Sequence, residues 1–382
     1  MRQVLICGAG VGGLAAAHRL RRLLPASDRI VVFDQSPVHT FWPSLLWMMT
    51  GARQADQVVR PLSALRERGV TVESSAVTAI DAESLTVTAG DRRWTGDALI
   101  LALGADLDPE RIPGLVEGGD NFYTVAGAEQ VHRRLAELER GRVVVLVSRM
   151  PFKCPAAPYE AAMLIDGYLR KRRRREAVDI AVWVAEPAPM GVAGPSVSQG
   201  VINALTERGI DYHPHETVIG VDPTTKRLKF QSGQTVDYDL LAYVPPHRVP
   251  SVVEAAGLAS ESGWIAVNRH TLETSVPNVF AIGDVTGIPL ALGKPLPKAG
   301  VFAHAQGEIV AKILAHRLAG REESASFTGE GECFIEMGRG VAGFARGNFY
   351  AEPEPQVRTY RSGRHWHGAK VLFERHWWQQ WW

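Results

Sequence analysis

Cys154 is the side chain of this sequence best placed for nucleophilic chemistry. It lies in a turn between a predicted strand at 142–147 and a predicted helix at 159–170. A thiol near the start of a helix, with Lys153 beside it, has two reasons to ionise to the reactive thiolate. The alternative is a small buried hydrophobic residue, the usual state of a lone free cysteine. The position and its neighbours favour a redox or nucleophilic role.

The chain holds two other cysteines, Cys7 and Cys333. Three cysteines are too few for a secreted disulfide scaffold, and they lack the paired spacing of a zinc site, so no metal is expected. Cys7 lies at the end of the first predicted strand. We interpret it as a packing residue, because buried cysteines are usually inert.

A glycine motif near the N-terminus predicts a dinucleotide site. A short apolar strand at 4–7 leads into Gly8, Gly10 and Gly13, and a helical stretch at 14–24 follows. In this spacing the first glycine permits a tight turn, the second lets a pyrophosphate approach the backbone, and the third packs helix against strand. The start of the helix then faces the phosphates. A glycine-rich turn without a ligand is the alternative.

An acidic residue completes this motif. The second predicted strand, at 29–33, ends at Asp34, about 20 residues after the glycines, where a carboxylate binds the ribose of an adenosine. Strand, turn, helix and acid in this order make the dinucleotide interpretation much stronger than the glycine spacing alone.

Composition places these motifs in a globular chain with several packed units. The 382 residues are too many for one ordinary core, and 46% of them are hydrophobic. The 42 basic and 41 acidic side chains give a net charge of +1, so a nucleic acid partner is not indicated. The first residues lack the pattern of a cleavable signal, and no run of about 18 apolar residues predicts a spanning helix. We expect small-molecule chemistry in a protein that can still lie on a membrane.

The chain resembles the two-dinucleotide-fold flavoproteins in further segments. The stretch 276–284 looks like the motif that closes the flavin site of that superfamily, in which Gly283 would allow close approach and Asp284 would contact the ribityl chain. The run 98–104, which ends at Gly104, looks like the strand and turn that complete the first flavin segment. The resemblance implies FAD as the cofactor.

The middle of the chain lacks the second glycine motif that docks NADH or NADPH in most such flavoproteins. The turn after the strand at 142–147 spans 148–160 and contains no glycine, but three prolines and several bulky side chains. A pyrophosphate needs bare backbone at this position. A nicotinamide donor is therefore disfavoured.

The segment 152–160, FKCPAAPYE, resembles the corresponding part of sulfide:quinone oxidoreductases and of the flavoprotein subunit of flavocytochrome c sulfide dehydrogenase. The likeness also takes in 244–247, 297–300 and Cys333, and extends over nearly the whole chain. In that family two matching cysteines face the flavin as a disulfide or polysulfide bridge. The resemblance implies that sulfide attacks the bridge, that Cys154 keeps the persulfide and that Cys333 attacks the flavin.

Two further residues take roles by this resemblance. Glu160 would manage protons beside the cysteine turn, or it would only complement the dipole at the first turn of a helix. Lys298 would polarise the pyrimidine end of the flavin, or it would only end a loop.

The chain departs from the family pattern at two places. Many sulfide:quinone oxidoreductases carry a third cysteine and a nearby histidine where this chain has Tyr123 and Gly127. The length of sulfur chain that the protein can build is therefore open. The cysteine that anchors flavin covalently in flavocytochrome c is missing from 36–50, so FAD is expected to be non-covalent.

Five of the ten tryptophans fall in the last 17 residues. On a helix, one apolar face would hold Trp366, Ala369, Phe373, Trp377 and Trp381. Because tryptophan favours the membrane interface, we predict a helix lying in the membrane plane and a peripheral, membrane-associated protein. The alternative is a helix docked on the body of the protein or on a second subunit, which leaves a homo-oligomer open.

Apolar residues also cluster at 41–49, where they predict an exposed apolar entrance to a binding site (a greasy mouth), with core packing as the alternative. The family resemblance implies that Phe344, Phe349 and Phe373 enclose a quinone ring.

The predicted fold is α/β, with two Rossmann-like domains of the disulfide-reductase type and a C-terminal membrane-associating segment. We assign 1–112 and 268–325 to an FAD-binding domain and 113–267 to a second Rossmann-like domain without a functional nicotinamide site. Residues 326–382 form the segment that carries Cys333 and the membrane contact.

The predicted function is FAD-dependent oxidation of sulfide, or of a related small sulfur compound, through Cys154 and Cys333 with electrons passed to a membrane quinone. One rival is a flavocytochrome c type subunit with a cytochrome acceptor. A type II NADH:quinone dehydrogenase is the second rival, and a flavin-bearing redox sensor or binding protein is the third.

Overall fold

The computed structural model describes residues 1–322 and 325–382. Its first domain is built on a parallel five-stranded sheet, as the predicted flavin domain requires. The strands, in spatial order, are β20 (Val279–Ala281), β9 (Ala98–Leu101), β1 (Gln3–Cys7), β2 (Arg29–Phe33) and β5 (Thr71–Glu73). Apart from the short edge strand β5, these strands are mostly apolar and buried, as expected of a parallel sheet that is covered on both faces.

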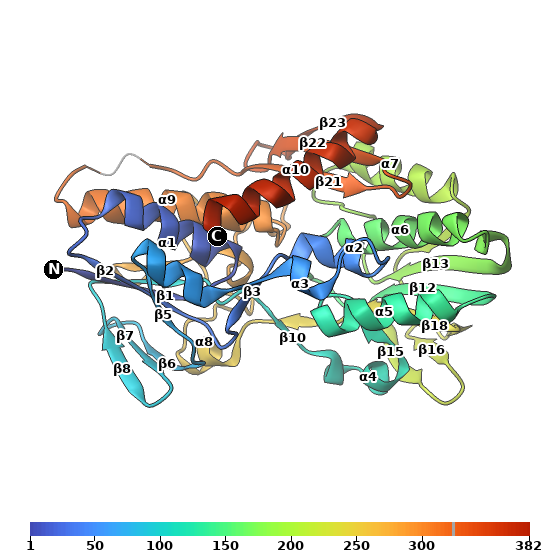
Figure 1. The fold of residues 1–382 in the computed structure, drawn as a ribbon, viewed down its shortest axis with the longest axis horizontal. Helices are drawn as coiled ribbons and strands as arrows, with labels where there is room; N and C mark the ends of the chain where they lie inside the picture. The colour runs from blue at the N-terminus through green and yellow to red at the C-terminus, as the bar shows by residue number, and fades with distance from the viewer. Residues whose placement is uncertain (323–324) are drawn as a thin grey trace.

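Two helices cover one face of this sheet. Helix α1 (Val11–Leu23) and helix α9 (Gly300–Leu318) lie side by side along it (Figure 1). The small residues Gly12, Ala15 and Gly307 let the two backbones approach closely. The opposite face carries an antiparallel sheet of β6 (Val77–Asp81), β7 (Thr86–Ala89) and β8 (Arg92–Thr95), with the short helix α8 (Ser251–Ala255) beside it.

The second domain repeats this plan. Its parallel sheet consists of β11 (Asp120–Asn121), β18 (Leu240–Val244), β12 (Gly141–Val147), β13 (Val178–Val184) and β14 (Ile210–His213). Its helices are α4 (Leu115–Gly118), α5 (Val125–Glu137), α6 (Ala157–Lys171) and α7 (Pro195–Thr206). A small antiparallel sheet of β15 (Val218–Asp222), β16 (Arg227–Phe230) and β17 (Thr235–Asp237) completes it.

The chain leaves and re-enters the first domain at one place. There β10 (Asp106–Leu107) pairs antiparallel with β19 (His247–Arg248). Val249, Val253 and Trp264 then pack in the core of the first domain. The stretch 249–265 therefore packs with the first domain, whereas the sequence analysis assigned it to the second.

The C-terminal segment forms a third unit that lies across both domains. An antiparallel sheet of β21 (Glu330–Glu336), β22 (Ala342–Asn348) and β23 (Gln356–Gly363) leads into helix α10 (Arg364–Trp381). This helix, red in Figure 1, runs from the sheet back toward α1 and α9, where the chain ends. No helix among the described residues has the length and apolar character needed to cross a membrane.

The face of α10 predicted to lie in a membrane is largely packed against the protein. Trp377 is 3% exposed and Trp381 is fully buried, with its ring against His18 of α1, whereas Phe373 is 46% exposed. The buried face consists of Lys370, Glu374, Trp377 and Trp381. The predicted face was wrong because two charged residues point inward, and each has a buried partner. The alternative of a helix docked on the body describes α10.

The segment 41–49 also packs inward, contrary to the predicted greasy mouth. It joins β3 (Val38–Thr40) to the short helices α2 (Leu45–Met48) and α3 (Ala55–Val58), which lead to β4 (Val59–Pro61). Leu45, Leu46, Met48 and Met49 belong to the core of the second domain. Trp42 alone of this segment is strongly exposed.

The docked position of α10 predicts that alanine substitutions at a buried and at an exposed position of this helix have unequal effects on stability. Replacing Trp381 by Ala removes a fully buried ring and should lower the free energy of unfolding by about 3–5 kcal/mol. The control Leu372→Ala, at a side chain 63% exposed, should change it by less than about 0.5 kcal/mol. Urea unfolding followed by circular dichroism measures both. Equal losses, or none for Trp381→Ala, would contradict the docked helix.

Candidate active site at the domain junction

The glycine loop has the geometry that its spacing predicts. Helix α1 begins at Val11, directly after the loop. Gly8 has a φ of +106°, and a Cβ there would collide with the carbonyl of Ala102, while a Cβ on Gly13 would collide with the carbonyl of Gly8. A Cβ on Gly10 would meet nothing within 4 Å. The turn thus requires Gly8 and Gly13, and Gly10 leaves bare backbone at the positive end of a helix, which suits a pyrophosphate.

Asp34 fastens this loop from the neighbouring strand. Its carboxylate accepts the Ala9 N–H at 2.8 Å and the Ser36 N–H at 2.8 Å. Burial raises the pKa of Asp34, and these two hydrogen bonds oppose the rise. Because a carboxylate offers about four lone-pair positions, it retains capacity for a ribose hydroxyl.

A second loop, after β20, meets the first domain's sheet at the same end. Gly283 has a φ of +72° and donates its N–H to Gln306 of α9 at 2.7 Å. Lys298 donates from Nζ to the carbonyls of Asp284, at 2.6 Å, and Thr286, at 3.0 Å, and lies over the ring of Trp264. Burial lowers the pKa of Lys298 to about 7, although Asp284 raises it. Lys298 therefore holds the Asp284 loop against the start of α9.

Gly104 follows β9 with a φ of +72°, and a Cβ there would meet nothing within 4 Å. Like Gly10, it leaves bare backbone at the carboxyl end of the sheet, where ligands of such folds bind.

The cysteine turn of the second domain is joined to the Lys298 loop of the first. The N–H of Cys154 donates to the carbonyl of Lys298 at 2.7 Å, and Lys153 and Lys298 form a parallel bridge. The hydroxyl of Tyr123 donates to the carbonyl of Lys153 at 2.7 Å. Cys154 has a φ of +55°, which a non-glycine residue adopts only where its surroundings impose it. These contacts fix the thiol at the junction of the two domains.

Cys333 reaches the same place from the C-terminal sheet. It lies on β21 opposite Ala345 of β22, and both residues line a cavity of about 780 Å³ together with Cys154 and Lys298. All three cysteines of the chain are free thiols, and Cys7 is fully buried in β1, away from this cavity's lining. The structure thus brings Cys154 and Cys333 together.

Burial raises the pKa of both thiols instead of lowering it. The pKa of Cys154 lies above its usual range and that of Cys333 rises to about 12, and Glu160 raises both further, while Lys370 lowers both. Burial therefore opposes the thiolate that the position of Cys154 beside a helix and a lysine favours. The ammonium of Lys153 lies 4.5 Å from the centre of the Trp42 ring, and Lys370 is the cation that lowers the pKa of the Cys154 thiol.

Glu160, which raises the pKa of both thiols, also contacts a series of further ionisable groups. Its Oε1 accepts the N–H of Glu336 at 2.7 Å and pairs with Lys370 Nζ at 3.0 Å. Burial disfavours the charged form of Lys370, but Glu160 and Glu336 outweigh it and raise its pKa. The carboxylate of Glu336 then contacts Nδ1 of His367 at 3.0 Å, and His367 is partly exposed.

Sequence reasoning missed Lys370, Glu336 and His367. The only local signal was the occurrence of charged residues among the tryptophans of α10, at positions where a purely apolar face would not place them.

The three phenylalanines expected around a quinone do not form one group. Phe344 stacks on Trp366 with 4.3 Å between ring centres, and Phe373 contacts Phe334, which also contacts Phe344. Phe349 instead packs against Phe302 and lines the cysteine cavity. Side chains alternate along a strand, so Phe344 lies on the opposite face of the sheet from Ala345 and the cavity.

A family model described as pyridine nucleotide-disulphide oxidoreductase matches residues 2–147 and 160–307. The chain belongs to this family. It is an oxidoreductase of the FAD-dependent type, in agreement with the glycine loop and the Asp284 loop.

Among curated relatives, the chain is similar to the mitochondrial sulfide:quinone oxidoreductase of Mus musculus, with 26% identity over 92% of this chain and 79% of the relative. It is also 26% identical to the sulfide-quinone reductase of Aquifex aeolicus, over 98% of this chain and 90% of the relative. The crystal structure of the sulfide:quinone oxidoreductase from Aquifex aeolicus superposes with a TM-score of 0.90, at 25% identity over 100% of this chain and 91% of that one. The resemblance inferred from the sequence is confirmed.

Glu160 and Lys370 act on the Cys333 thiol in opposite directions, which predicts opposite mutational effects. In a Cys154→Ser background, Lys370→Met should raise the pKa of Cys333 and slow its alkylation at pH 9 roughly three- to tenfold, and Glu160→Gln should lower the pKa and speed alkylation. The rate of iodoacetamide labelling, followed by mass spectrometry, measures both.

The control for this experiment is Lys171→Met, which removes an exposed charge at the end of α6. It should leave the labelling rate unchanged. Shifts in the same direction for Lys370→Met and Glu160→Gln would show that the two groups do not set the thiol's protonation.

Proposed function

We propose that this chain oxidises sulfide at Cys154 and Cys333 and passes the electrons through non-covalently bound FAD to a quinone. The observation that carries the proposal is that two thiols from different parts of the chain line one cavity beside the Lys298 loop. The relatives named sulfide:quinone oxidoreductase support the choice of substrate and acceptor.

The turn that precedes α6 supports a sulfur donor over a nicotinamide donor. Phe152 and Ala156 are buried in it, and its backbone is paired with Lys298 and Tyr123. Pro158 lies in the first turn of α6, where a nucleotide-binding helix would present free N–H groups. The turn presents a cysteine at the place where a pyrophosphate would bind.

Several residues fit the flavin. The loop of Gly8, Gly10 and Gly13 would hold the pyrophosphate, and Asp34 would bind the adenosine ribose. Gly104, Gly283 and Asp284 would lie along the remainder of the molecule. When bound, FAD accepts two electrons from the sulfur side and releases them to a quinone. Binding without a covalent link agrees with the absence of any cysteine at 36–50.

The sulfur step begins from the oxidised pair: Cys154 and Cys333, free thiols in this structure, would first be joined as a disulfide by giving up two protons and by passing two electrons to the bound flavin. Hydrosulfide attacks the sulfur of Cys154, so that a new S–S bond forms and the bond to Cys333 breaks. Cys154 then holds a persulfide, and Cys333 leaves as a thiolate that carries the bonding electron pair. This exchange conserves electrons within the sulfur atoms, so oxidation is complete only after two electrons pass on.

Proton movement in this step falls to the buried chain of ionisable groups. The proton released from the persulfide or from hydrosulfide needs an acceptor near the thiols, and Glu160 is a buried carboxylate whose charge raises the pKa of both thiols. Glu160 pairs with Lys370 and accepts the backbone N–H of Glu336, whose own carboxylate pairs with the partly exposed His367. We assign Glu160 to proton transfer on this geometry.

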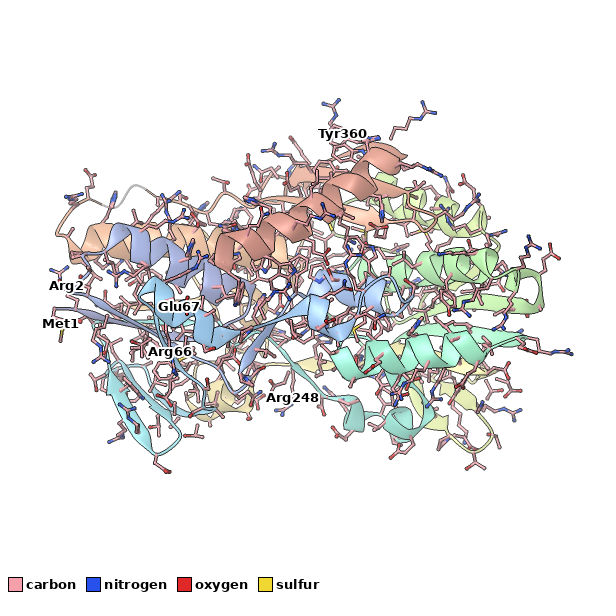
Figure 2. All side chains as sticks on the ribbon, in the orientation of Figure 1. Met1, Arg2, Arg66, Glu67, Arg248 and Tyr360 are labelled. Carbon is pink, nitrogen blue, oxygen red and sulfur yellow. The ribbon has the colours of Figure 1, made fainter. Side chains whose placement is uncertain are left out.

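The acceptor side is proposed at the outer face of α10. Leu372 is 63% exposed and Phe373 is 46% exposed, and Trp42 and Tyr360 are also exposed. Figure 2 shows Tyr360 at the outer edge of the molecule, beside α10. Exposed apolar side chains of this kind favour a membrane surface. A quinone would then reach the protein near Phe344 and Phe373, which both contact Phe334.

The choice of donor has a direct spectroscopic test. Anaerobic addition of sulfide to the flavin-loaded protein should bleach the flavin absorbance fully, and an equal amount of NADH should leave it unchanged, because the turn before α6 offers no pyrophosphate site. A spectrophotometric titration measures both. Bleaching by NADH and none by sulfide would refute the proposed function.

The membrane contact predicts that charge on the outer face of α10 weakens vesicle binding. Leu372→Glu combined with Phe373→Glu should reduce co-sedimentation with phospholipid vesicles several-fold, because buried charge in the interface is costly. The control is Leu23→Glu, at a side chain 40% exposed at the end of α1. Equal loss for the control, or no loss for the double variant, would place the membrane contact elsewhere.

A further inference from the structure

His39 connects the glycine loop to the C-terminal helix. It lies on β3 and is 2% exposed. Its Nδ1 lies 3.0 Å from the carbonyl oxygen of Ala9, and the indole Nε1 of Trp377 lies 3.3 Å from its Nε2. Residue 9 and residue 377 are thus joined through one buried imidazole.

The chemistry of the indole and imidazole groups determines which atoms donate and which accept in these two hydrogen bonds. An indole N–H can only donate, so Nε2 of His39 must accept from Trp377. The ring proton then lies on Nδ1, which donates to the carbonyl of Ala9. Burial lowers the pKa of His39 to about 4, although the bond to Ala9 raises it, so the neutral ring that this arrangement requires is the one present.

The bond to Ala9 determines where the next amide points. In a trans peptide the carbonyl of Ala9 and the N–H of Gly10 lie in one plane and point in opposite directions. His39 holds that carbonyl on one side, and Asp34 holds the N–H of Ala9 at 2.8 Å. The Gly10 N–H therefore points away from His39. A Cβ on Gly10 would meet nothing within 4 Å, so the space beside this amide is open.

Trp377 is held too firmly to follow a shift of the imidazole. Its ring contacts Phe41, with 5.6 Å between ring centres, and His304 of α9. One turn earlier on α10, the buried carboxylate of Glu374 accepts the hydroxyl of Ser44 at 2.5 Å and pairs with Arg53 at 2.6 Å. The helix thus presents the indole N–H at a fixed position.

We propose that His39 and Trp377 are positioning residues for the flavin: the indole selects the ring tautomer of His39, and His39 aims the Gly10 N–H at the pyrophosphate of FAD. The C-terminal helix is thereby part of the flavin site, although it contributes none of the residues of the glycine motif. This inference rests on the proposed FAD site.

The test is FAD retention by the holoenzyme, measured as the dissociation constant from flavin fluorescence after dilution. Trp377→Phe keeps an aromatic ring but lacks the N–H, and should weaken FAD binding roughly three- to tenfold, the usual effect of one lost hydrogen bond. The control is Trp378→Phe: Trp378 also contacts the His39 ring, but only by its edge. This control should bind FAD as the unmodified protein does.

A second pair of variants, both at His39, separates the loss of these hydrogen bonds from a general folding defect. His39→Gln supplies an amide that can donate to Ala9 and accept from Trp377, and should retain FAD better than His39→Leu by at least about threefold. Adding Trp377→Phe to His39→Leu should weaken FAD binding no further, because both changes interrupt the same series of hydrogen bonds from Trp377 to Ala9. Circular dichroism on each variant reports the fold.

The outcomes separate this inference from the proposed function. Unchanged FAD affinity in Trp377→Phe, or equal affinity in His39→Gln and His39→Leu, would overturn the positioning role while sulfide still bleached the unmodified protein. An unmodified protein that did not bind FAD would overturn both.

Discussion

The backbone bond from Cys154 N–H to the carbonyl of Lys298 is the contact on which the site depends. It pairs a loop of the second domain with a loop of the first, and the side chain of Lys298 continues the connection to the carbonyls of Asp284 and Thr286. One run of hydrogen bonds therefore relates the thiol to the loop proposed to hold the flavin. Relative movement of the two domains would separate them, so the bonded junction and its buried surroundings keep the reacting groups in register.

Helix α10 performs a similar task from the other side. Its inward residues occur at three successive positions of one face: Lys370 reaches Glu160 beside the thiols, Glu374 reaches Ser44 and Arg53, and Trp377 reaches His39. A buried ion pair contributes little net stability, because the cost of removing charges from water offsets their attraction. The paired charges instead specify one position for the helix, and in that position the charge of Lys370 lowers the pKa of both thiols.

The features that sequence reasoning predicted are those whose cause is local. Gly13 is required by a clash with Gly8, a residue of the motif itself, and Gly8 has a φ of +106° that favours glycine, so the spacing alone indicates the turn. The face of α10 was mispredicted because Lys370 points inward toward Glu160, a residue 210 positions away. Nothing near residue 370 in the sequence reveals that partner. The burial that raises the pKa of Cys154 also comes from distant segments, which the residues adjacent to it in the sequence do not reveal. Cys333 carried no local signal and was found only through family resemblance.

The central claim is that electrons reach the flavin through Cys154 and Cys333. Its most direct measurement is the anaerobic rate of flavin reduction by sulfide, by stopped-flow absorbance, in the variants Cys154→Ser and Cys333→Ser, with Cys7→Ala as the control. The account predicts that each serine variant loses sulfide-driven reduction by at least about a hundredfold but is still reduced by dithionite, and that the control reacts normally. Sulfide-driven reduction at the unmodified rate in either serine variant would contradict it.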